Sequence, residues 1–413
     1  MRRVEHLRVR AATDGPLRHR LLSLFAEVLR DTRRGPEAVT SGLRAARELG
    51  SPERRFVSDA VHDLVRMRRR LSFLARSDAP EALLSTWLEE LRDPHGAANR
   101  VDGIADPRER LAVGASFPDF LVDRLIAQYG IDEAARLCAA LNRRAPLTVR
   151  ANRIKGSRQE LGARLLEIGI CSHPCVIATD GLVLETRQNV YALAPFREGW
   201  MELQDEGSQL IAELVAPPPR GTVVDACAGA GGKTLALGAL LANRGRVFSF
   251  DVGDERLEEL RRRARRAGLT NVHATLAPRS GPPESARPAE RVLLDVPCSG
   301  TGALRRNPEA RWRLQPRDLD ELRVKQRAIL DAYAALVVPG GRLVYATCSV
   351  LREENEEVVG GFRAAHPSFE LVPAKEILGK ERALQLGDGE VLRLLPHLQG
   401  TDGFFACVLR RSR

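Results

Sequence analysis

The segment TVVDACAGAGGKTLALGALLAN, residues 222–243, joins a short apolar run to a helix-forming run through a glycine-rich turn. Valines followed by glycines and then by leucines and alanines predict a strand, a tight turn and a helix. In an open α/β sheet, ligands bind outside the carboxyl ends of the strands, where such a turn lies. Glycines let a ligand approach the backbone closely, and a helix N-terminus favours negative charge. The segment therefore predicts a ligand-binding strand–turn–helix unit.

Strand and helix patterns alternate through residues 205–413. Such alternation is typical of a parallel sheet with helices on both faces. A long helix is expected from about residue 318 to 336, and Pro339-Gly340-Gly341 is expected to separate it from the next strand. The predicted strands are TVVDA (222–226), RVFSF (246–250), RVLLD (291–295) and RLVYAT (342–347), with an antiparallel edge pair of FELV (369–372) and GFFACVLR (403–410). We expect an α/β, Rossmann-like sheet.

The first part of the chain is predicted to be helical. Residues 17–30 and 53–76 carry apolar side chains three and four positions apart, as amphipathic helices do. Ser51 is expected to cap the second of these, with Pro52 in its first turn. The stretch DPHGAANRVDGIADPRER, residues 93–110, is predicted to be a hinge or linker because it is rich in Gly, Pro and Asp.

These patterns divide the chain into three predicted domains. Residues 1–115 form a helical domain, residues 116–204 a small α+β module, and residues 205–413 the sheet domain. Within the module, PLTVRANRI (146–154) has β-branched residues in partial alternation and predicts a strand.

The composition excludes several classes of protein. Hydrophobic residues make up 44% and charged residues 29% of the 413, so the chain is not wholly disordered. No apolar run approaches the roughly 20 residues that span a bilayer, and the N-terminus shows no secretory signal. Seven scattered cysteines do not form a disulfide pattern, which favours a reducing cytoplasm.

Positive charge is concentrated at the N-terminal end. The net charge is +10, and residues 1–80 hold 18 arginines against 10 acidic residues. Such a basic end is typical of a protein that binds a polyanion, and arginine suits phosphate geometry. A GC-rich genome would also enrich arginine, so both interpretations remain open.

The glycine turn fits one class of ligand better than two others. A phosphate-binding P-loop needs a glycine where Cys227 stands, and a dinucleotide fingerprint needs a third glycine at Thr234. Asp225 opens the turn, and Asp251 follows about 20 residues after Gly229, the position from which a carboxylate binds ribose hydroxyls. This pattern suits a nucleoside-bearing methyl donor, and a tight turn without a ligand is the alternative.

Two cysteines follow predicted strands. Cys298 lies in DVPCSGTG after the third strand, and Cys348 lies in YATCS at the end of the fourth, just before the acidic stretch REENE (352–356). A single cysteine at a strand end is usually a small packing residue. Two of them at the same edge of a sheet would instead bring two thiols to one cofactor.

A thiol beside a methyl donor suggests covalent catalysis on a pyrimidine. Carbon 5 of the ring is a poor nucleophile, and a thiolate that adds to carbon 6 makes it reactive. A nearby acid can hydrogen-bond the ring nitrogen as charge builds there, and a neighbouring cation or helix N-terminus helps the thiol lose its proton.

Together these motifs resemble those of the RsmB/NOP/SUN family of S-adenosylmethionine-dependent RNA cytosine-5 methyltransferases. The matching segments are DACAGAGGKT (225–234), DVPCSGTGALRRNPEARWR (295–313), PGGRLVYATCSVLREENEEVV (339–359), GTDGFFACVLRR (400–411), LQDEGSQL (203–210) and PLTVRAN (146–152). The resemblance implies a class I methyltransferase sheet, S-adenosylmethionine as cofactor and a cytosine of 16S ribosomal RNA as substrate. ERRFVSDAVHDLVRMRRRL (53–71) resembles a NusB-like RNA-binding domain, which goes with ribosomal RNA as substrate.

The resemblance also implies residue roles. Cys348 is the expected nucleophile and Cys298 is expected to assist release of the covalent product, while Asp295 and Lys233 contact the flipped cytosine or its surroundings. No metal is expected. The expected cofactor-binding residues are Asp225, Cys227, Ala228, Gly229, Ala230, Gly231, Gly232, Lys233, Asp251 and Asp295.

Two departures from the family pattern stand out. Gly229-Ala230 replace the Ala-Pro of the usual CAAPGGK turn. The segment NVHATLAPRSGPPESARP (271–288) lacks the acid that often contacts the adenine side, so no adenine contact is assigned.

Other functions remain open from the sequence. They are a tRNA cytosine-5 methyltransferase, a non-catalytic RNA-binding assembly factor, a small-molecule methyltransferase and a DNA cytosine methyltransferase, whose nucleophile would be Cys298. The expected partner is RNA, either ribosomal RNA or a small-subunit assembly particle, with no membrane and a monomeric chain.

Overall fold

The computed structural model describes residues 2–13, 15–32, 35–386 and 389–413, which divide into two compact units. One unit is residues 1–144 with 303–316, and the other is residues 145–302 with 317–413. The predicted division into three domains, with boundaries after residues 115 and 204, stays a prediction. It was based on sequence pattern, whereas the two units are defined by compactness. In the described part of the chain, no helix is long and apolar enough to cross a membrane.

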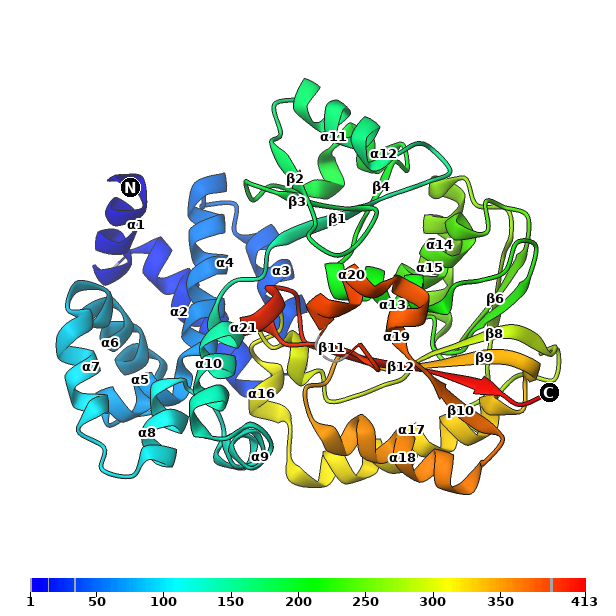
Figure 1. Cartoon of the computed structure of the whole chain (residues 1–413). Helices are drawn as coiled ribbons and strands as arrows, with labels where there is room; N and C mark the ends of the chain where they lie inside the picture. Colours follow the sequence, from blue (N-terminus) through cyan, green and yellow to red (C-terminus); the bar gives the residue numbers. More distant parts are fainter. Residues whose placement is uncertain (1, 14, 33–34, 387–388) are drawn as a thin grey trace. The chain divides into compact units, whose positions relative to one another are not determined.

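The first unit is helical, as predicted for residues 1–115. Its core contains Leu21, Phe25, Leu64 and Leu71, none of which is measurably exposed. The described helices of this unit are α1 (Arg2–Ala12), α2 (Pro16–Arg30), α3 (Gly35–Ala45), α4 (Ser51–Arg66), α5 (Arg68–Ala75), α6 (Pro80–Arg92), α7 (Pro94–Asp102), α8 (Pro107–Gly114), α9 (Asp119–Tyr129), α10 (Ile131–Asn142) and α16 (Ala310–Arg313) (Figure 1).

Two details of α4 and α5 differ from the expectation. The predicted helix over 53–76 is broken at Met67, which has φ −96° and ψ 11°, so α4 and α5 are separate. The N-cap of α4 is Gly50 rather than Ser51, and the Gly50 N–H donates to Glu53 Oε2 at 2.7 Å. Pro52 does lie in the first turn, where its missing N–H costs nothing.

The predicted linker over 93–110 is wrong, because the structure has two helices there. Asp93 caps α7 and Asp106 caps α8, each accepting a hydrogen bond from the backbone of the first turn. Pro94 and Pro107 follow these caps inside the helices. Aspartate followed by proline is therefore a helix start here, not a break.

A distant segment completes the helical unit. Arg311 in α16 has no exposed surface, and its Nη1 donates to Ser116 O at 3.2 Å and Asn142 Oδ1 at 2.8 Å. The guanidinium also lies 4.0 Å from the centre of the Phe117 ring. The next residue, Trp312, donates from Nε1 to Val65 O at 2.6 Å. Residues 303–316 thus follow the Cys298 loop in sequence but belong to the helical unit.

The second unit contains two sheets. The smaller one has the order β2-β3-β1-β4, is antiparallel throughout, and includes β1 over the strand predicted at 146–154. Its elements are β1 (Leu147–Ala151), α11 (Arg158–Glu167), β2 (Ser172–Pro174), β3 (Gly181–Leu184), η1 (Val190–Ala192), α12 (Ala194–Arg197) and β4 (Met201–Leu203).

The larger sheet confirms the predicted α/β architecture. Its order is β10-β12-β9-β8-β5-β6-β7, with β11 paired to β12, and the five strands from β9 to β7 are parallel. Its strands are β5 (Thr222–Asp225), β6 (Arg246–Asp251), β7 (Val272–Leu276), β8 (Ala289–Asp295), β9 (Val337–Thr347), β10 (Phe369–Val372), β11 (Leu392–Leu394) and β12 (Phe404–Arg411). The sequence analysis did not identify β7 and β11.

Helices cover both faces of this sheet (Figure 1). Neighbouring residues of a strand face opposite sides, so Val223 joins one core cluster and Val224 the other. The first cluster packs against α13 (Glu206–Val215), α14 (Gly232–Leu240) and α19 (Ala374–Leu378). The second packs against α17 (Pro316–Ala334) and α18 (Glu356–Ala365).

Two expectations about the sheet need correction. Strand β9 begins at Val337, so Pro339-Gly340-Gly341 lies within it rather than before it. Ala289 pairs with Val337 and Arg291 pairs with Arg342, which leaves a bulge where Gly340 adopts φ +77°. The pair at 369–372 and 403–410 is antiparallel as expected, but β12 lies between β9 and β10 and is not an edge strand.

We expect Arg311→Ala to destabilise the helical unit by about 2–4 kcal/mol, because it removes buried packing and leaves buried carbonyl groups without a donor. Urea unfolding followed by circular dichroism measures this change. Arg313→Ala is the matched control, since Arg313 is exposed and its loss should cost less than about 0.5 kcal/mol. Equal stabilities of the two variants would contradict the structural role of Arg311.

Candidate active site

The glycine turn follows β5 and leads into α14. Gly231 caps the helix with φ +88°, and a Cβ atom there would lie 2.6 Å from Leu260 Cγ and 2.9 Å from Leu235 Cδ1. Both its backbone conformation and its crowding therefore require glycine. Gly229 has φ +53°, but a Cβ there would meet no atom within 4 Å, so the turn is open on that side.

Asp251 at the end of β6 holds the turn in place. Its Oδ2 accepts the Gly229 N–H at 2.9 Å and its Oδ1 accepts the Gly253 N–H at 2.8 Å. The carboxylate is buried. Oδ1 also lies 3.6 Å from Arg256 Nη1, whereas Oδ2 keeps a second lone pair that a hydroxyl group of a ligand could use.

Asp225 carries an unsatisfied oxygen. Its Oδ2 accepts the Thr234 hydroxyl at 2.6 Å, whereas its buried Oδ1 has no hydrogen-bond partner among the described residues. Burial raises the pKa of Asp225 to about 7. Buried polar atoms are rarely left unpaired, so this oxygen suits a donor group of a ligand. The open turn and this oxygen fit a cofactor that carries an amino acid and a nucleoside.

The other residues of the turn are arranged around this opening. Cys227 is partly exposed, and burial raises the pKa of its thiol above the ordinary value. The Ala228 N–H donates to Phe250 O at 2.9 Å, and Ala230 O accepts from Arg263 Nη1 at 2.6 Å. These bonds fix the backbone of the turn to β6 and to α15 (Asp254–Ala267).

Lys233 and Asp295 form an ion pair, with Nζ 2.6 Å from Oδ2. Burial lowers the pKa of Lys233, but the Asp295 carboxylate outweighs burial and the pKa is raised above its ordinary value. The Cys348 sulfur contributes to the same rise. Lys233 is therefore a buried ammonium group that acts on both Asp295 and Cys348.

The two cysteines meet where β8 and β9 end. Cys298 Sγ and Cys348 Sγ are 3.3 Å apart, and both side chains are partly exposed free thiols. The strands pair in parallel with Asp295 opposite Ala346, so the two loops begin side by side. The hydrogen bond with Cys348, and then burial, raise the pKa of Cys298 well above its ordinary value. The geometric expectation that the sulfurs converge is confirmed.

The structure thus brings the predicted residues into two connected groups. Asp251 at the end of β6 binds Gly229 in the turn that Asp225 opens, and Lys233 in α14 binds Asp295 and interacts with Cys348. The catalytic and cofactor-binding roles of these residues stay predictions. In the described residues, no group of three or more His, Cys, Asp or Glu could hold a metal ion.

Sequence reasoning missed a buried polar group behind the cysteines. Glu354, fully buried in η3 (Arg352–Glu354), accepts hydrogen bonds from Ser299, Ser349 and Gln326. The sequence does contain a signal for it, the acidic stretch REENE (352–356) after Cys348. Its spacing alone does not show which acid turns inward.

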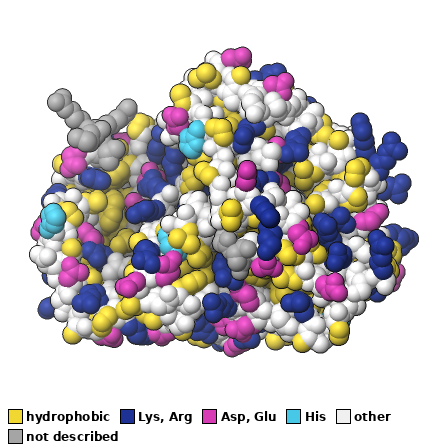
Figure 2. All heavy atoms as spheres, in the orientation of Figure 1, with side chains coloured by type: hydrophobic (Ala, Val, Ile, Leu, Met, Phe, Trp, Pro, Cys, Tyr) yellow, Lys and Arg dark blue, Asp and Glu magenta, His cyan; other side chains and the backbone are white. Residues whose placement is uncertain are grey.

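The arginines of residues 66–70 act within the helical unit. Arg66 binds Asp63, Arg69 binds Asp119 and Phe117 O, and Arg70 binds Glu90. These contacts support a structural role for the segment that resembles a NusB-like domain. On the face shown in Figure 2, Lys and Arg side chains are interspersed with Asp and Glu rather than gathered in one patch.

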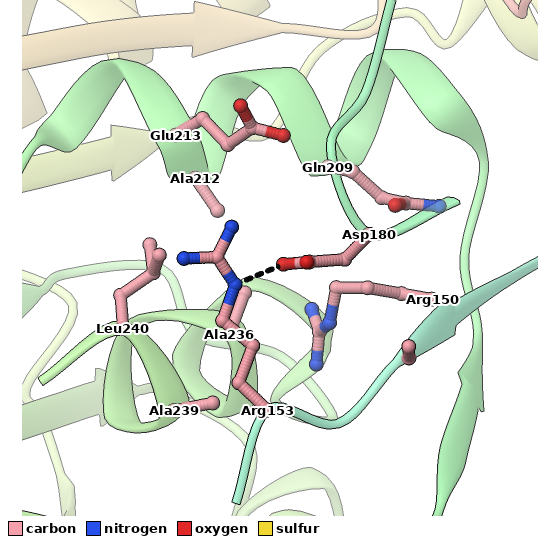
Figure 3. Close-up of a pocket in the computed structure, with 10 residues that line it drawn as sticks. Arg150, Arg153, Asp180, Gln209, Ala212, Glu213, Ala236, Ala239 and Leu240 are labelled. Carbon is pink, nitrogen blue, oxygen red and sulfur yellow. Dashed lines mark hydrogen bonds and ion pairs between the residues drawn. The ribbon is translucent and has the colours of Figure 1, made fainter. Parts of the chain in front are cut away.

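The structure also has a small pocket beside the four-stranded sheet. Figure 3 shows Arg153 reaching Asp180 across it, and the ion pair measures 2.6 Å. Its volume is about 10 Å³, enough for a single water at most. It is therefore too small for a nucleoside.

Comparisons with known proteins agree with this site. The family model described as "16S rRNA methyltransferase RsmB/F" matches residues 212–410. A second family model, described as "Methyltr_RsmF/B-like, ferredoxin-like domain", matches residues 117–191. The chain is 37% identical over 315 residues to the probable ribosomal RNA small subunit methyltransferase B of Bacillus subtilis (strain 168), which covers 75% of this chain and 70% of that protein. It is 33% identical over 346 residues to the protein of the same name from Synechocystis sp.. That alignment covers 82% of this chain and 77% of the Synechocystis protein.

A solved structure of a methyltransferase homolog protein from Pyrococcus horikoshii aligns with a TM-score of 0.63 and 26% identity, covering 75% of this chain and 100% of that one. The sheet and the glycine turn define an S-adenosylmethionine-dependent methyltransferase, so the predicted cofactor is confirmed. Within that class, the chain belongs to the RsmB/F family of 16S rRNA methyltransferases, as the resemblance predicted. The NusB-like character of the N-terminal region is not confirmed.

We expect the stability of the cofactor-free protein to depend on Asp225 and pH. Because the folded pKa of about 7 lies above the ordinary value of 3.8, this group favours folding at low pH and loses that contribution as pH rises toward 7. Asp225→Asn removes the titration, so its free energy of unfolding should rise relative to the native protein between pH 5 and 7.5. Urea unfolding at both pH values tests this, and a constant difference would contradict it.

Proposed function

We propose that this chain transfers a methyl group from S-adenosylmethionine to carbon 5 of a cytosine in 16S ribosomal RNA, through a covalent bond between Cys348 and the base. The observation that carries this proposal is the 3.3 Å approach of the Cys298 and Cys348 sulfurs beside Lys233 and Asp295. Membership in an RNA methyltransferase family supports the class of substrate.

The reaction begins at Cys348. Its thiolate adds to carbon 6 of the cytosine, which moves electron density to carbon 5. The Lys233 ammonium stabilises the negative charge on the sulfur before the addition. Asp295 Oδ2 is held by Lys233, which leaves Oδ1 to accept a hydrogen bond from the flipped base.

S-adenosylmethionine, bound at the glycine turn, supplies an electrophilic methyl group. Asp225 and Asp251 would hold it from the ends of β5 and β6, through the unpaired Oδ1 of Asp225 and the remaining lone pair of Asp251 Oδ2. With the methyl group on carbon 5, a solvent water takes the proton of that carbon, and the electron pair of the broken carbon–hydrogen bond forms the double bond between carbons 5 and 6. The bond between carbon 6 and sulfur breaks, and Cys348 recovers the electron pair. Cys298 assists this last step from its position beside the nucleophile.

A DNA-type mechanism would assign the nucleophile to Cys298. The Cys348 sulfur is one of the groups that raise the pKa of the buried Lys233, and this electrostatic interaction favours Cys348 as the nucleophile, because a cation stabilises a thiolate. A tRNA substrate or a non-catalytic assembly role remains the alternative to ribosomal RNA methylation. Bisulfite sequencing of total RNA from cells with and without the gene distinguishes these substrates.

We expect Cys348→Ala to reduce methyl transfer to RNA by at least about 10³-fold, since it removes the nucleophile. We expect Cys298→Ala to accumulate a covalent protein–RNA adduct, visible as a slower band on a denaturing gel. Cys407→Ala is the control, because Cys407 is buried in the core of the sheet and is not one of the predicted site residues. Full activity of Cys348→Ala would show that the two cysteine roles are wrongly assigned.

A further inference from the structure

One carboxylate connects the loops that carry the two cysteines. Glu354 Oε1 accepts the Ser299 N–H at 2.8 Å and Gln326 Nε2 at 3.0 Å. Its Oε2 accepts the hydroxyl groups of Ser299 and Ser349. Ser299 follows Cys298 and Ser349 follows Cys348 in the chain. Glu354 therefore binds the residue next to each sulfur.

The carboxylate is fully buried and its partners are neutral. Among the described residues, its hydrogen-bond donors are a backbone N–H, two hydroxyl groups and an amide. Four donors can stabilise a buried carboxylate in its charged form without a cation. In the part of the chain that the structure describes, no ion pair with Glu354 is found, so its carboxylate lies behind the sulfur pair with neutral partners.

That charge acts unequally on the two thiols. After the sulfur–sulfur contact and burial, Glu354 is a further cause that raises the pKa of Cys298. On the other side, Cys348 interacts with Lys233, which is paired with Asp295. Tyr345, whose hydroxyl donates to Glu354 O at 2.6 Å, has a raised pKa from burial and stays neutral. A negative group thus acts on Cys298 and a positive one on Cys348.

We propose that Glu354 is the positioning residue of the cysteine pair: it fixes the two loops and its charge keeps the thiol proton on Cys298, so that Cys348 is the nucleophile. The statement that Cys348 is the nucleophile rests on the proposed function. Which of the two thiols keeps its proton is a property of the protein without RNA or cofactor. Of the two thiol protons, one goes to solvent water and the other stays on Cys298, where the S–H donates to the Cys348 sulfur.

Other contacts hold the loops when the charge is removed. The Gly302 N–H donates to Cys348 O at 2.9 Å, and Asn355 Nδ2 donates to Ser349 O at 3.0 Å. The Val350 N–H donates to Thr301 Oγ1 at 3.1 Å. Glu354→Gln keeps the shape of the side chain and an oxygen that accepts hydrogen bonds. It therefore removes the charge and preserves these contacts.

The test is the rate of alkylation of each cysteine by iodoacetamide across pH 6–10, read by mass spectrometry on the full chain without RNA or cofactor. In the native protein Cys298 should react only at high pH. In Glu354→Gln the Cys298 rate at pH 8 should rise at least about tenfold, with a smaller change at Cys348. Glu357→Gln is the control, since Glu357 is exposed and pairs with Arg323.

An unchanged Cys298 profile in Glu354→Gln would overturn the proposal. Methyl-transfer kinetics give a second measurement: kcat should fall at least tenfold while the KM for RNA changes less than threefold, because the charge acts on the sulfurs and not on RNA binding. If Cys348→Ala keeps full activity while the alkylation profile shifts as expected, the proposed function fails and the proton assignment stands. Circular dichroism of Glu354→Gln checks that the fold is intact.

Discussion

The contact between the Cys298 and Cys348 sulfurs depends on the register of two parallel strands. Strands β8 and β9 pair so that Asp295 lies opposite Ala346. Cys298 and Cys348 each follow within three residues of the end of their strand. A shift of one residue would turn every side chain of β9 to the other face. The buried residues of β9, Leu343 and Tyr345 on one face and Val344 on the other, oppose such a shift. The core of the sheet therefore sets the 3.3 Å distance in the site.

The sequence predicted the elements of this site better than its interactions. The four strands of the parallel sheet that the sequence identified, the glycine turn and the convergence of the cysteines follow from apolar periodicity and from the rule that strand ends share an edge. The partners of Glu354 could not be predicted in this way. They come from α17 and from the two loops that follow β8 and β9, which meet only after the sheet has formed. Strand β7 was missed because its residues are only partly buried, which gives a weak apolar pattern.

The helical unit shows a different limit of sequence reasoning. Local signals predicted its helices. The composition of residues 93–110, rich in Pro, Gly and Asp, wrongly predicted a linker there. The order of these residues is what matters, because an aspartate directly before a proline is a helix cap at both places. The position of residues 303–316 in this unit could not be predicted from local pattern, since Arg311 and Trp312 find their partners near residues 65, 116 and 142. The segment that begins beside the cysteine loop of one unit therefore serves as core of the other.

Four acidic residues of the site differ in the groups that bind their carboxylates, and these partners distinguish the one with an unpaired oxygen from the other three. Asp251 is bound by backbone N–H groups, Asp295 by Lys233, and Glu354 by neutral side chains and one N–H, so each is held in place. Asp225 alone among these four has a buried oxygen without a partner in the described residues, and its pKa is raised to about 7. A cationic group placed there would satisfy that oxygen and favour the ionised form. S-adenosylmethionine carries an ammonium group that can donate hydrogen bonds, so under the proposed function its binding beside Asp225 would offset the free energy lost by burying that carboxylate in the free protein.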